Sequence, residues 1–492
     1  MVRIDFVYVD ESHQRLLGME LDLRPDICVI GAGSAGLSVA SLAAQLGAKV
    51  VLIERGRMGG ECLNSGCVPS KALLAAAKVA HTVRKAHLFG IDAVPLVDFK
   101  RVHAHVRSVI DAIAPHDSVE RFEKLGVTVI RGEAQFNSPR EIVVGNQMIR
   151  AHRTVVATGS APVVPPIPGL DEVRYFTNET IFGNDVLPEH LIILGGGPIG
   201  VEIGQAYRRL GAKVTIVERE KAMPKDDQEL ARPLLQHLID EGVVIRERAS
   251  VMAASQDGAG VNLTVEEAGQ TTQLRGSHLL VAAGRSARTA GLGLQAAGIK
   301  FDKAGIAVDK HLKTSVRGIY AAGDVVDGPR FTHVCSYHAG IVIRNALFRM
   351  PAKIDYRSLP WVTYTDPELA QIGMTEETAR QEHGDHVRIV RVQYEANDRA
   401  QTERGTEGMV KLIAHRRGHV LGASILGAHA GELAHLWVVA IEQKLKLRDL
   451  AQMIAPYPTW GELDKTAASE FSRPLLANSL TRGLVRVLSC LP

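Results

Sequence analysis

Cysteine is scarce in this chain, with five residues among 492. Small secreted domains rely on a dense disulfide framework, and five scattered cysteines cannot supply one. The start of the chain, MVRIDFVYVDESHQRLLG, carries acidic residues early and lacks the apolar segment of a signal peptide. We therefore expect a cytoplasmic protein, in which two cysteines close together are more often redox-active or metal-binding than structural.

Long apolar runs and an excess of one charge are also absent. No apolar stretch reaches the ~18 residues that suggest a membrane-spanning helix. Lys and Arg number 57 against 54 Asp and Glu, which leaves a net charge of +3, and no dense Lys/Arg run occurs. This balance argues against a nucleic-acid partner. The length is sufficient for roughly two to four domains and a large core.

What the chain does contain is a repeat. Residues 31–55 read GAGSAGLSVASLAAQLGAKVVLIER, and residues 195–219 read GGGPIGVEIGQAYRRLGAKVTIVER, without a gap between the two alignments. An apolar segment precedes each copy, at 27–30 and at 191–194. Each copy therefore predicts a strand, a G-x-G-x-x-G turn, an amphipathic helix and a second strand that ends in Glu.

This pattern is the dinucleotide-binding βαβ unit. Its glycines make a tight turn, admit a pyrophosphate to the backbone and let the helix pack on the strand, while the helix N-terminus carries the phosphate charge. They are Gly31, Gly33 and Gly36 in the first copy, and Gly195, Gly197 and Gly200 in the second. Glu54 and Glu218 end the second strands, where a carboxylate can accept hydrogen bonds from a ribose diol. We expect two bound dinucleotides, a flavin and a nicotinamide.

The nicotinamide cofactor is expected to be NAD(H) rather than NADP(H). Glu218 would repel the 2′-phosphate of NADP(H). Arg219 and Lys221 follow closely and soften this preference.

Two of the five cysteines, Cys62 and Cys67, lie in the segment GGECLNSGCVPSK, residues 59–71. A zinc site would need two more ligands, and the chain has no second Cys pair. Inert core thiols fit poorly with the polar LNSG between them. A reversible disulfide requires Cα atoms about 4.4–6.8 Å apart, whereas five residues of regular helix rise about 7.5 Å. We therefore expect a distortion near Gly66 and Pro69, with a regular helix only from SKALLAAAKVA, at 70–80.

The same segment, following GAGSAG, resembles the flavin-linked redox disulfide of the pyridine nucleotide–disulfide oxidoreductases. Further motifs resemble this family: VVATGSAP (155–162), YAAGDV (320–325) and WVTYTDPELAQIGMTE (361–376). Dihydrolipoamide dehydrogenase, glutathione reductase and mercuric reductase are members. The resemblance covers all but about the first 24 and the last 25 residues.

The resemblance implies a role for each matching residue. Cys62 would meet the substrate, and Cys67 would be the thiolate beside the flavin. Lys71 would pair with Glu202 near the reactive nitrogen of the flavin. The residues expected to hold FAD are Gly31, Gly33, Ser34, Gly36, Glu54, Arg55, Gly60, Lys71, Thr158, Gly159, Gly323 and Asp324. Those expected to hold NAD(P) are Gly195, Gly197, Ile199, Gly200, Glu202, Glu218 and Gly284.

The chain departs from the family near its C-terminus. Disulfide-reducing members carry a motif like H-P-T-x-x-E, whose His comes from the partner subunit and serves as acid and base for the interchange thiol. Here the segment is APYPTWGE (455–462): Pro458, Thr459 and Glu462 match, but Tyr457 replaces the His. Tyr, with a reference pKa near 10, shuttles protons poorly at neutral pH. Mercuric reductase is similar here, with a Tyr in a PY context.

Three functions remain open. The first is a mercuric reductase-like enzyme that passes electrons from NAD(P)H through FAD and the dithiol to a thiophilic metal ion or another acceptor, with Cys62 and Cys67 as transient Hg(II) ligands and no resident metal site. The second is a dihydrolipoamide dehydrogenase-like disulfide reductase. The third is a redox-sensing flavoprotein that binds a partner or a membrane. The single tail cysteine, Cys490, and the NAD preference weigh against full mercuric reductase identity.

The expected fold is α/β, with two Rossmann-like dinucleotide-binding domains and a C-terminal α+β dimerisation domain built on a mixed sheet. The expected boundaries are an N-terminal extension (1–24), an FAD domain (25–160 and 285–354), an NAD(P) domain (161–284), an interface domain (355–475) and an amphipathic tail (476–492). The expected partners are a second copy of the chain, in a homodimer, and a small-molecule or metal-ion acceptor. The tail is expected to contact the dimer partner or, peripherally, a membrane.

Overall fold

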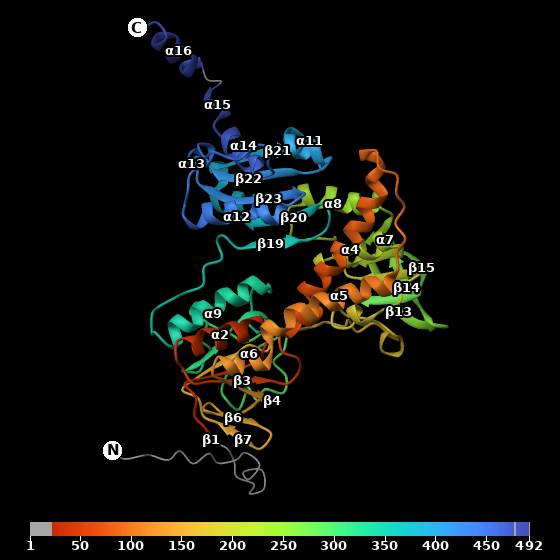
Figure 1. Cartoon of the computed structure of the whole chain (residues 1–492), viewed down its shortest axis with the longest axis vertical. Coiled ribbons are helices and arrows are strands. Elements are labelled where there is room, and N and C mark those ends of the chain that lie inside the picture. The colour runs from red at the N-terminus through yellow and green to blue at the C-terminus, as the bar shows by residue number, and fades with distance from the viewer. Residues whose placement is uncertain (1–21, 477–478, 492) are drawn as a thin grey trace. The chain divides into compact units, whose positions relative to one another are not determined.

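The computed structural model describes residues 22–476 and 479–491 (Figure 1). These residues form two compact units. The first unit holds the described residues up to Cys67 together with Ile110–Ala161 and Arg285–Ile354. The second unit holds Val68–Val109, Pro162–Gly284 and the described residues from Asp355 onward. The predicted α/β fold class is confirmed, since each unit contains a parallel sheet with helices.

A five-stranded parallel sheet forms the centre of the first unit, in the order β18-β8-β2-β3-β4. Its strands are β2 (Ile27–Ile30), β3 (Val50–Glu54), β4 (Val127–Arg131), β8 (Arg153–Val156) and β18 (Ile319–Ala321). Helices α2 (Ser34–Gln45) and α9 (Thr332–Ala346) pack against each other and share an apolar core with this sheet (Figure 1). Strands β2, β3, β8 and β18 are almost wholly buried, as expected for a parallel sheet with covered faces, whereas the edge strand β4 exposes Thr128 and Arg131.

A second, smaller sheet in this unit has the order β1-β7-β6-β5. Its strands are β1 (Asp22–Leu23), β5 (Gln135–Ser138), β6 (Glu141–Val144) and β7 (Gln147–Ile149), and a two-stranded sheet joins β9 (Ser160–Pro162) to β17 (Arg285–Ala287). Strand β1 comes from the expected N-terminal extension (1–24), which thus contributes its last residues to a sheet. Residues 1–21 of that extension lie outside the described part.

The redox segment forms a short helix and the start of a long one. Helix α3 covers Gly60–Ser65, and helix α4 covers Cys67–Lys85. The expected distortion between them is present at Gly66, whose φ of −125° and ψ of −116° are not helical. The expected start of the regular helix at residue 70 is wrong, because α4 begins at Cys67. Pro69 is compatible with this start, since the first turn of a helix needs no backbone donor there.

Further helices follow α4, at first within the second unit and, from residue 110 onward, within the first. They are α5 (Phe99–Ile113) and α6 (Val119–Lys124), with short 3₁₀ turns η1 (Ala86–Phe89), η2 (Ala114–Asp117) and η5 (Gly323–Val325).

The second unit contains a four-stranded parallel sheet in the order β12-β11-β10-β16. Its strands are β10 (His190–Leu194), β11 (Lys213–Glu218), β12 (Val243–Glu247) and β16 (His278–Val281). Its helices are α7 (Pro198–Leu210) and α8 (Gln228–Asp240), with the turns η3 (Leu170–Glu172) and η4 (Ile181–Gly183). An antiparallel sheet of β13 (Ala249–Asp257), β14 (Gly260–Glu267) and β15 (Gln270–Gly276) shares a core with it.

The C-terminal part of this unit has a five-stranded sheet in the order β19-β20-β23-β22-β21. Its strands are β19 (Pro360–Thr363), β20 (Glu368–Gly373), β21 (Val387–Gln393), β22 (Met409–His415) and β23 (Val420–Gly427). The expectation of a mixed sheet is wrong, because every pairing is antiparallel. Strands β22 and β23 are joined by a tight turn, which forces antiparallel pairing, and no crossover helix joins neighbouring strands.

Helices cover this sheet and continue to the end of the chain. They are α10 (Glu376–His383), α11 (Asp398–Glu403), α12 (Ala430–Glu442), α13 (Leu447–Ala451), α14 (Glu462–Glu470), α15 (Arg473–Leu476) and α16 (Ser479–Leu488), with η6 (Gly384–His386) and η7 (Tyr394–Ala396). Trp437 of α12 is fully buried in the core of this part. Across the described ranges, no helix has the length and apolarity that crossing a membrane requires.

Candidate functional site

The glycine turn of the first unit admits no side chain. Gly31 has a φ of +104°, and a Cβ added there would lie 2.4 Å from the carbonyl oxygen of Ala157. A Cβ at Gly36 would lie 1.8 Å from the carbonyl oxygen of Gly31. Both distances are far below contact, so the turn between β2 and α2 requires glycine at these two positions. The N-terminus of α2 follows directly and can carry a negative charge.

The second copy repeats this geometry. Gly195 has a φ of +115°, and its added Cβ would lie 2.4 Å from the carbonyl oxygen of Ala282. A Cβ at Gly200 would lie 2.0 Å from the carbonyl oxygen of Gly195. The sequence repeat is thus a structural repeat at the level of single atoms.

The two strand-ending glutamates hold these turns in the same way. Glu54 accepts hydrogen bonds from the backbone N–H of Ala32 and of Gly56, both at 2.6 Å. Glu218 accepts the equivalent bonds from Gly196 at 2.7 Å and from Glu220 at 2.9 Å. Each carboxylate oxygen still has a lone pair available for a ribose hydroxyl. These carboxylates therefore shape the turn before any dinucleotide binds, a role that the sequence alone did not suggest.

The redox segment lies against the first glycine turn. Gly59 and Gly60 have φ values of +84° and +57°. A Cβ added at Gly60 would lie 2.5 Å from the Cα of Gly33. The two backbones approach each other too closely for a side chain at Gly60, and this contact brings α3, which carries Cys62, to the dinucleotide turn.

Both cysteines of the pair are present as thiols. Sγ of Cys67 lies 3.4 Å from Oγ1 of Thr332, the first residue of α9. A hydrogen bond with Cys67, together with burial and the charge of Cys67, raises the pKa of Cys62, while hydrogen bonds with Thr332 and Ser34 oppose this shift. The two thiols are thus close enough to influence each other's protonation.

A hydrogen-bonded chain connects the redox segment to the YAAGDV motif. Glu61, next to Cys62, forms an ion pair with Arg285. Nε of Arg285 donates to Oγ of Ser160 at 2.9 Å, and Ser160 donates to the carboxylate of Asp324 at 2.8 Å. Sequence reasoning selected Asp324 but missed the other three. The only available signal was their position, since Glu61 adjoins Cys62, and Ser160 and Arg285 adjoin Gly159 and Gly284.

Thr158, Gly159 and Gly323, which are also expected around FAD, lie in the same unit, whereas Lys71 lies in the second. Oγ1 of Thr158 donates to the carbonyl of Arg288 at 2.8 Å, and Gly159 has a φ of +71°. The backbone N–H of Gly323 donates to Nδ1 of the buried His338 at 3.1 Å. Burial lowers the pKa of His338 to about 4. This histidine is therefore neutral at physiological pH and serves as a hydrogen-bond acceptor beneath Gly323.

Lys71 and Glu202, both in the second unit, form the expected ion pair. Nζ of Lys71 lies 2.8 Å from the carboxylate of Glu202, whose side chain is almost fully buried. The other oxygen of Glu202 accepts a hydrogen bond from the backbone N–H of Tyr364 at 2.8 Å. Nζ of Lys71 also lies 4.4 Å from the centre of the Tyr364 ring. Tyr364 therefore orients both partners, a role not foreseen from the sequence.

Tyr457 lies on the surface of the second unit, 70% exposed. Its hydroxyl donates a hydrogen bond to the carboxylate of Asp398 at 2.8 Å. This bond and the negative charge of Asp398 raise the pKa of Tyr457 above its ordinary value. Glu462 accepts a hydrogen bond from the backbone N–H of Thr459 at 3.3 Å. The tyrosine at the position of the family's histidine is thus held by a carboxylate of its own chain.

No resident metal centre is formed by the residues that the structure describes, which contain no group of three or more His, Cys, Asp or Glu side chains able to hold an ion. Of the other cysteines, Cys28 and Cys335 are buried and Cys490 is exposed.

Comparison with known families decides the classification. Residues 25–339 match the model of the pyridine nucleotide-disulphide oxidoreductases, and residues 359–468 match the dimerisation domain of the same family.

The chain belongs to this family.

Its relatives include members with different acceptors. The chain is 36% identical over 467 residues to a mercuric reductase of Streptomyces lividans, covering 93% of this chain and 98% of the relative. It is also 36% identical over 445 residues to a dihydrolipoyl dehydrogenase of Thermus scotoductus, covering 89% and 95%. A solved Cu(II) complex of the HOCl-induced flavoprotein disulfide reductase RclA from Escherichia coli superposes with a TM-score of 0.82 at 30% identity, covering 91% and 99%.

Members of this family bind FAD and a pyridine nucleotide, and the turns of this chain fit such cofactors. The added Cβ of Gly33 meets only the Cα of Gly60, at 3.8 Å, and that of Gly197 meets no atom within 4 Å. Each turn therefore leaves open space above the backbone, at the N-terminus of a helix, where a pyrophosphate would approach. The family and the geometry together establish an enzyme of the FAD-containing pyridine nucleotide-disulphide oxidoreductase class.

Proposed function

We propose that this enzyme uses NAD(P)H to reduce the Cys62–Cys67 pair and passes the electrons on to a thiophilic metal ion, or to another acceptor that needs no proton shuttle. The observation that carries the proposal is the hydrogen bond from Tyr457 to Asp398. Exchange between the dithiol and a disulfide substrate needs one proton delivered and one removed. A phenol whose pKa is raised by a neighbouring carboxylate performs neither step well at neutral pH.

Reduction of a metal ion has no such requirement. Two thiolates can bind a soft ion such as Hg(II) directly. The overall reaction, NADH + Hg(II) → NAD⁺ + H⁺ + Hg(0), moves two electrons and releases the one proton to solvent. The mercuric reductase relative and the copper complex of RclA support a metal-ion acceptor for this chain.

The two thiols divide the work according to their protonation. Because the pKa of Cys62 is raised by Cys67, Cys62 keeps its proton when Cys67 ionises. We assign the first thiolate to Cys67 and the contact with substrate to Cys62. The loss of the Cys62 proton upon metal binding then completes a pair of thiolate ligands.

FAD supplies the hydride chemistry when it is bound. The chain's own residues would bind and orient it: the turn at Gly31 and Gly33 would hold the pyrophosphate, and Asp324 is fixed by Ser160. Lys71 is held by Glu202 and Tyr364, so that its ammonium group stays in one place. Glu218 supports a preference for NADH over NADPH, because a carboxylate at that strand end repels a 2′-phosphate.

A homodimer completes the proposal, since the chain carries the family's dimerisation domain. In the family's arrangement Tyr457 and Glu462 would face Cys62 of the partner subunit. We retain the domain boundaries and the cytoplasmic location expected from the sequence as parts of this proposal.

A dihydrolipoamide dehydrogenase-like activity is the second candidate, because a relative with that name is equally similar and Glu218 suits NAD. A redox-sensing role is the third. Its support is helix α16, on which Leu484, Val485, Val487 and Leu488 are exposed. That surface is available to a partner subunit or to a membrane.

Replacing Tyr457 tests the main proposal. We expect Tyr457→His to raise NADH-dependent lipoamide reduction by at least about tenfold, because His restores an acid–base group that titrates near neutral pH. Tyr457→Phe is the matched control. It should leave the rate of lipoamide reduction unchanged, since phenylalanine has no ionisable proton. If wild-type enzyme reduces lipoamide briskly, the second candidate replaces the first. If no variant turns over any acceptor, yet the reduced protein binds vesicles, the third candidate is favoured.

A further inference from the structure

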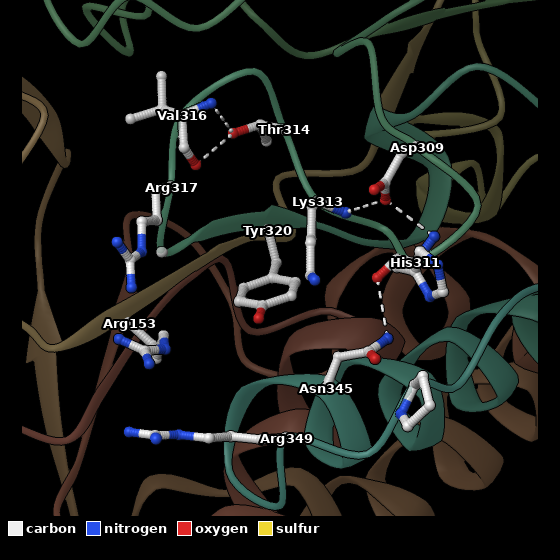
Figure 2. A pocket seen from close by; sticks show the side chains of 12 residues that line it. Arg153, Asp309, His311, Lys313, Thr314, Val316, Arg317, Tyr320, Asn345 and Arg349 are labelled. Atoms are coloured by element: carbon white, nitrogen blue, oxygen red, sulfur yellow. Dashed lines mark hydrogen bonds between the residues drawn. The ribbon is translucent and has the colours of Figure 1, made fainter.

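The first unit contains a cationic pocket that the redox function does not use. Figure 2 shows this pocket, which has a volume of about 580 Å³. Four of its side chains are cations, Arg153, Lys313, Arg317 and Arg349, whereas Asp309 is its one carboxylate. Arg153 is the first residue of β8, Lys313 and Arg317 lie in the segment before β18, and Arg349 lies after α9.

The pocket is distinct from the FAD turn. In the parallel sheet, Arg153 is paired with Ile27, the first residue of β2, whereas Gly31 follows the last residue of that strand. Four residues of strand separate the two positions, which corresponds to roughly 13 Å. Dinucleotides bind at the carboxyl ends of such strands. The pocket therefore lies at the opposite, amino-terminal edge of the sheet.

The cations of the pocket lack acidic partners. Among the residues with described positions, none of the four forms an ion pair with a carboxylate. Arg153 donates one hydrogen bond, to the carbonyl of His152 at 2.7 Å, and a guanidinium has further donors to offer. Four cations around one cavity repel each other in the absence of an anion. The guanidinium groups of the three arginines match the geometry of phosphate and carboxylate oxygens.

The wall that carries these cations is rigid. Oδ1 of Asp309 accepts hydrogen bonds from the backbone N–H of His311 at 2.8 Å and of Lys313 at 3.0 Å, which closes a tight turn. Leu312, between them, is fully buried. On the other side, Asn345 donates to the carbonyls of His311 and Ala352 and accepts from the N–H of Ala352. The one acidic side chain of the pocket is thus engaged in holding the wall.

Arg349, which lines the pocket, and Leu312, which lies between the lining residues His311 and Lys313, hold a backbone conformation that side chains rarely adopt. Leu312 has a φ of +62° and Arg349 a φ of +54°. Arg349 follows the end of α9, where glycine is the usual residue for such a φ. Strained conformations of this kind are concentrated at ligand-binding sites.

The floor of the pocket is the ring of Tyr320. Tyr320 is 5% exposed, and its pKa is raised by burial and lowered by Arg153, which places its hydroxyl near that cation. Figure 2 shows the ring in the middle of the pocket, with Arg153, Arg317, Lys313 and Arg349 around it. The four cations lie apart around this ring, so a single phosphate could contact only some of them. The arrangement therefore favours a ligand with several anionic groups.

We propose that this pocket binds a small polyanion carrying two or more phosphate or carboxylate groups. The volume is in the range of small-molecule sites, about 300–1,000 Å³. Each charged hydrogen bond to Arg317 or Arg349 strengthens the binding, and salt weakens it, since both side chains are exposed.

Isothermal titration of the FAD-loaded enzyme with inorganic pyrophosphate, and separately with citrate, tests the proposal. NAD⁺ is kept saturating so that the nicotinamide site is filled without reduction of the enzyme. We expect wild-type protein to bind one or both anions at low ionic strength, and tighter binding of pyrophosphate would identify phosphate as the preferred group. The double variant R317Q/R349Q should weaken binding by at least about tenfold.

Arg344→Gln is the matched control. Arg344 is an exposed arginine on α9 that does not line the pocket, and it donates to the carbonyl of Gly340 at 3.1 Å. This variant should bind as wild type does. The proposal is overturned if wild-type protein binds neither anion, if R317Q/R349Q binds equally well, or if R344Q loses as much affinity as the double variant. Unchanged NADH oxidation by R317Q/R349Q confirms that the variant is folded.

Discussion

At the scale of single residues, the proposed redox chemistry depends on different roles for two thiols. Cys62 is held at a raised pKa by its neighbour, and Cys67 contacts Thr332 at the start of α9. It is therefore unfavourable for both thiols to be ionised at the same time. We therefore propose that the thiolate of the reduced enzyme lies on Cys67.

Cys67→Ser should abolish the long-wavelength absorbance of the reduced, FAD-loaded enzyme, because that absorbance needs a thiolate beside the flavin and serine supplies none. Cys62→Ser should retain the band, since it leaves Cys67 in place. Absorbance spectra recorded during anaerobic titration with NADH measure both variants. If the band is retained in Cys67→Ser, the assignment of the thiolate to Cys67 is wrong.

Residue-scale prediction from the sequence was strongest where a backbone constraint fixes the amino acid. Gly31 and Gly195 were identifiable because the turn tolerates no side chain. The ion pair of Glu61 with Arg285 could not be predicted, because 224 positions separate the partners and neither local sequence pattern indicates the contact. The hydrogen bond from Tyr457 to Asp398 escaped prediction for the same reason.

At the scale of elements, the buried carboxyl group of Asp464 links two helices. It lies on α14 and accepts a hydrogen bond from the indole N–H of Trp437 on α12 at 2.8 Å. Burial raises the pKa of Asp464 to about 8. The folded protein therefore holds this proton across a range in which the unfolded chain, with a pKa near 4, releases it.

This difference predicts a pH dependence of stability. Below a pH of about 4, Asp464 is protonated in both the folded and the unfolded state. As the pH rises from there toward 8, this group lowers the free energy of unfolding by about 1.4 kcal/mol per pH unit. Asp464→Asn keeps the acceptor for Trp437 and removes the titration. We expect the stability of Asp464→Asn relative to wild type to increase between pH 5 and pH 8, measured as the difference in unfolding free energy by urea denaturation.

The exposed Asp385 provides a matched control for that comparison. Asp385→Asn should leave the difference from wild type constant between the two pH values. An equally constant difference for Asp464→Asn would show that Asp464 does not hold its proton in the folded state.

Element prediction was good for the repeat and poorer elsewhere. The strand–turn–helix–strand pattern at 31–55 and 195–219 is dictated locally, by apolar periodicity and glycine, and both copies adopt it. The start of α4 was misplaced because Pro69 was taken to delay a helix that tolerates proline in its first turn. The direction of the C-terminal strands was wrong because pairing depends on partners far apart in the sequence.

At the scale of the whole molecule, the fold class and the family followed from the order of the motifs along the chain. The cationic pocket could not be predicted from the sequence. Its four cations converge only when β8, β18 and α9 come together in one unit: Arg153, Lys313, Arg317 and Arg349. The acceptor is decided by what reaches Cys62, which depends on the assembled enzyme rather than on one motif.

The most direct measurement of the central claim is the reoxidation of the reduced enzyme by two acceptors. The FAD-loaded enzyme is reduced anaerobically with one equivalent of NADH and mixed rapidly with Hg(II) in excess thiol, or with lipoamide. We predict that Hg(II) reoxidises it at least about 100-fold faster, because disulfide exchange without a proton shuttle loses a factor of this size. Comparable reoxidation by lipoamide, or none by Hg(II), would contradict the account.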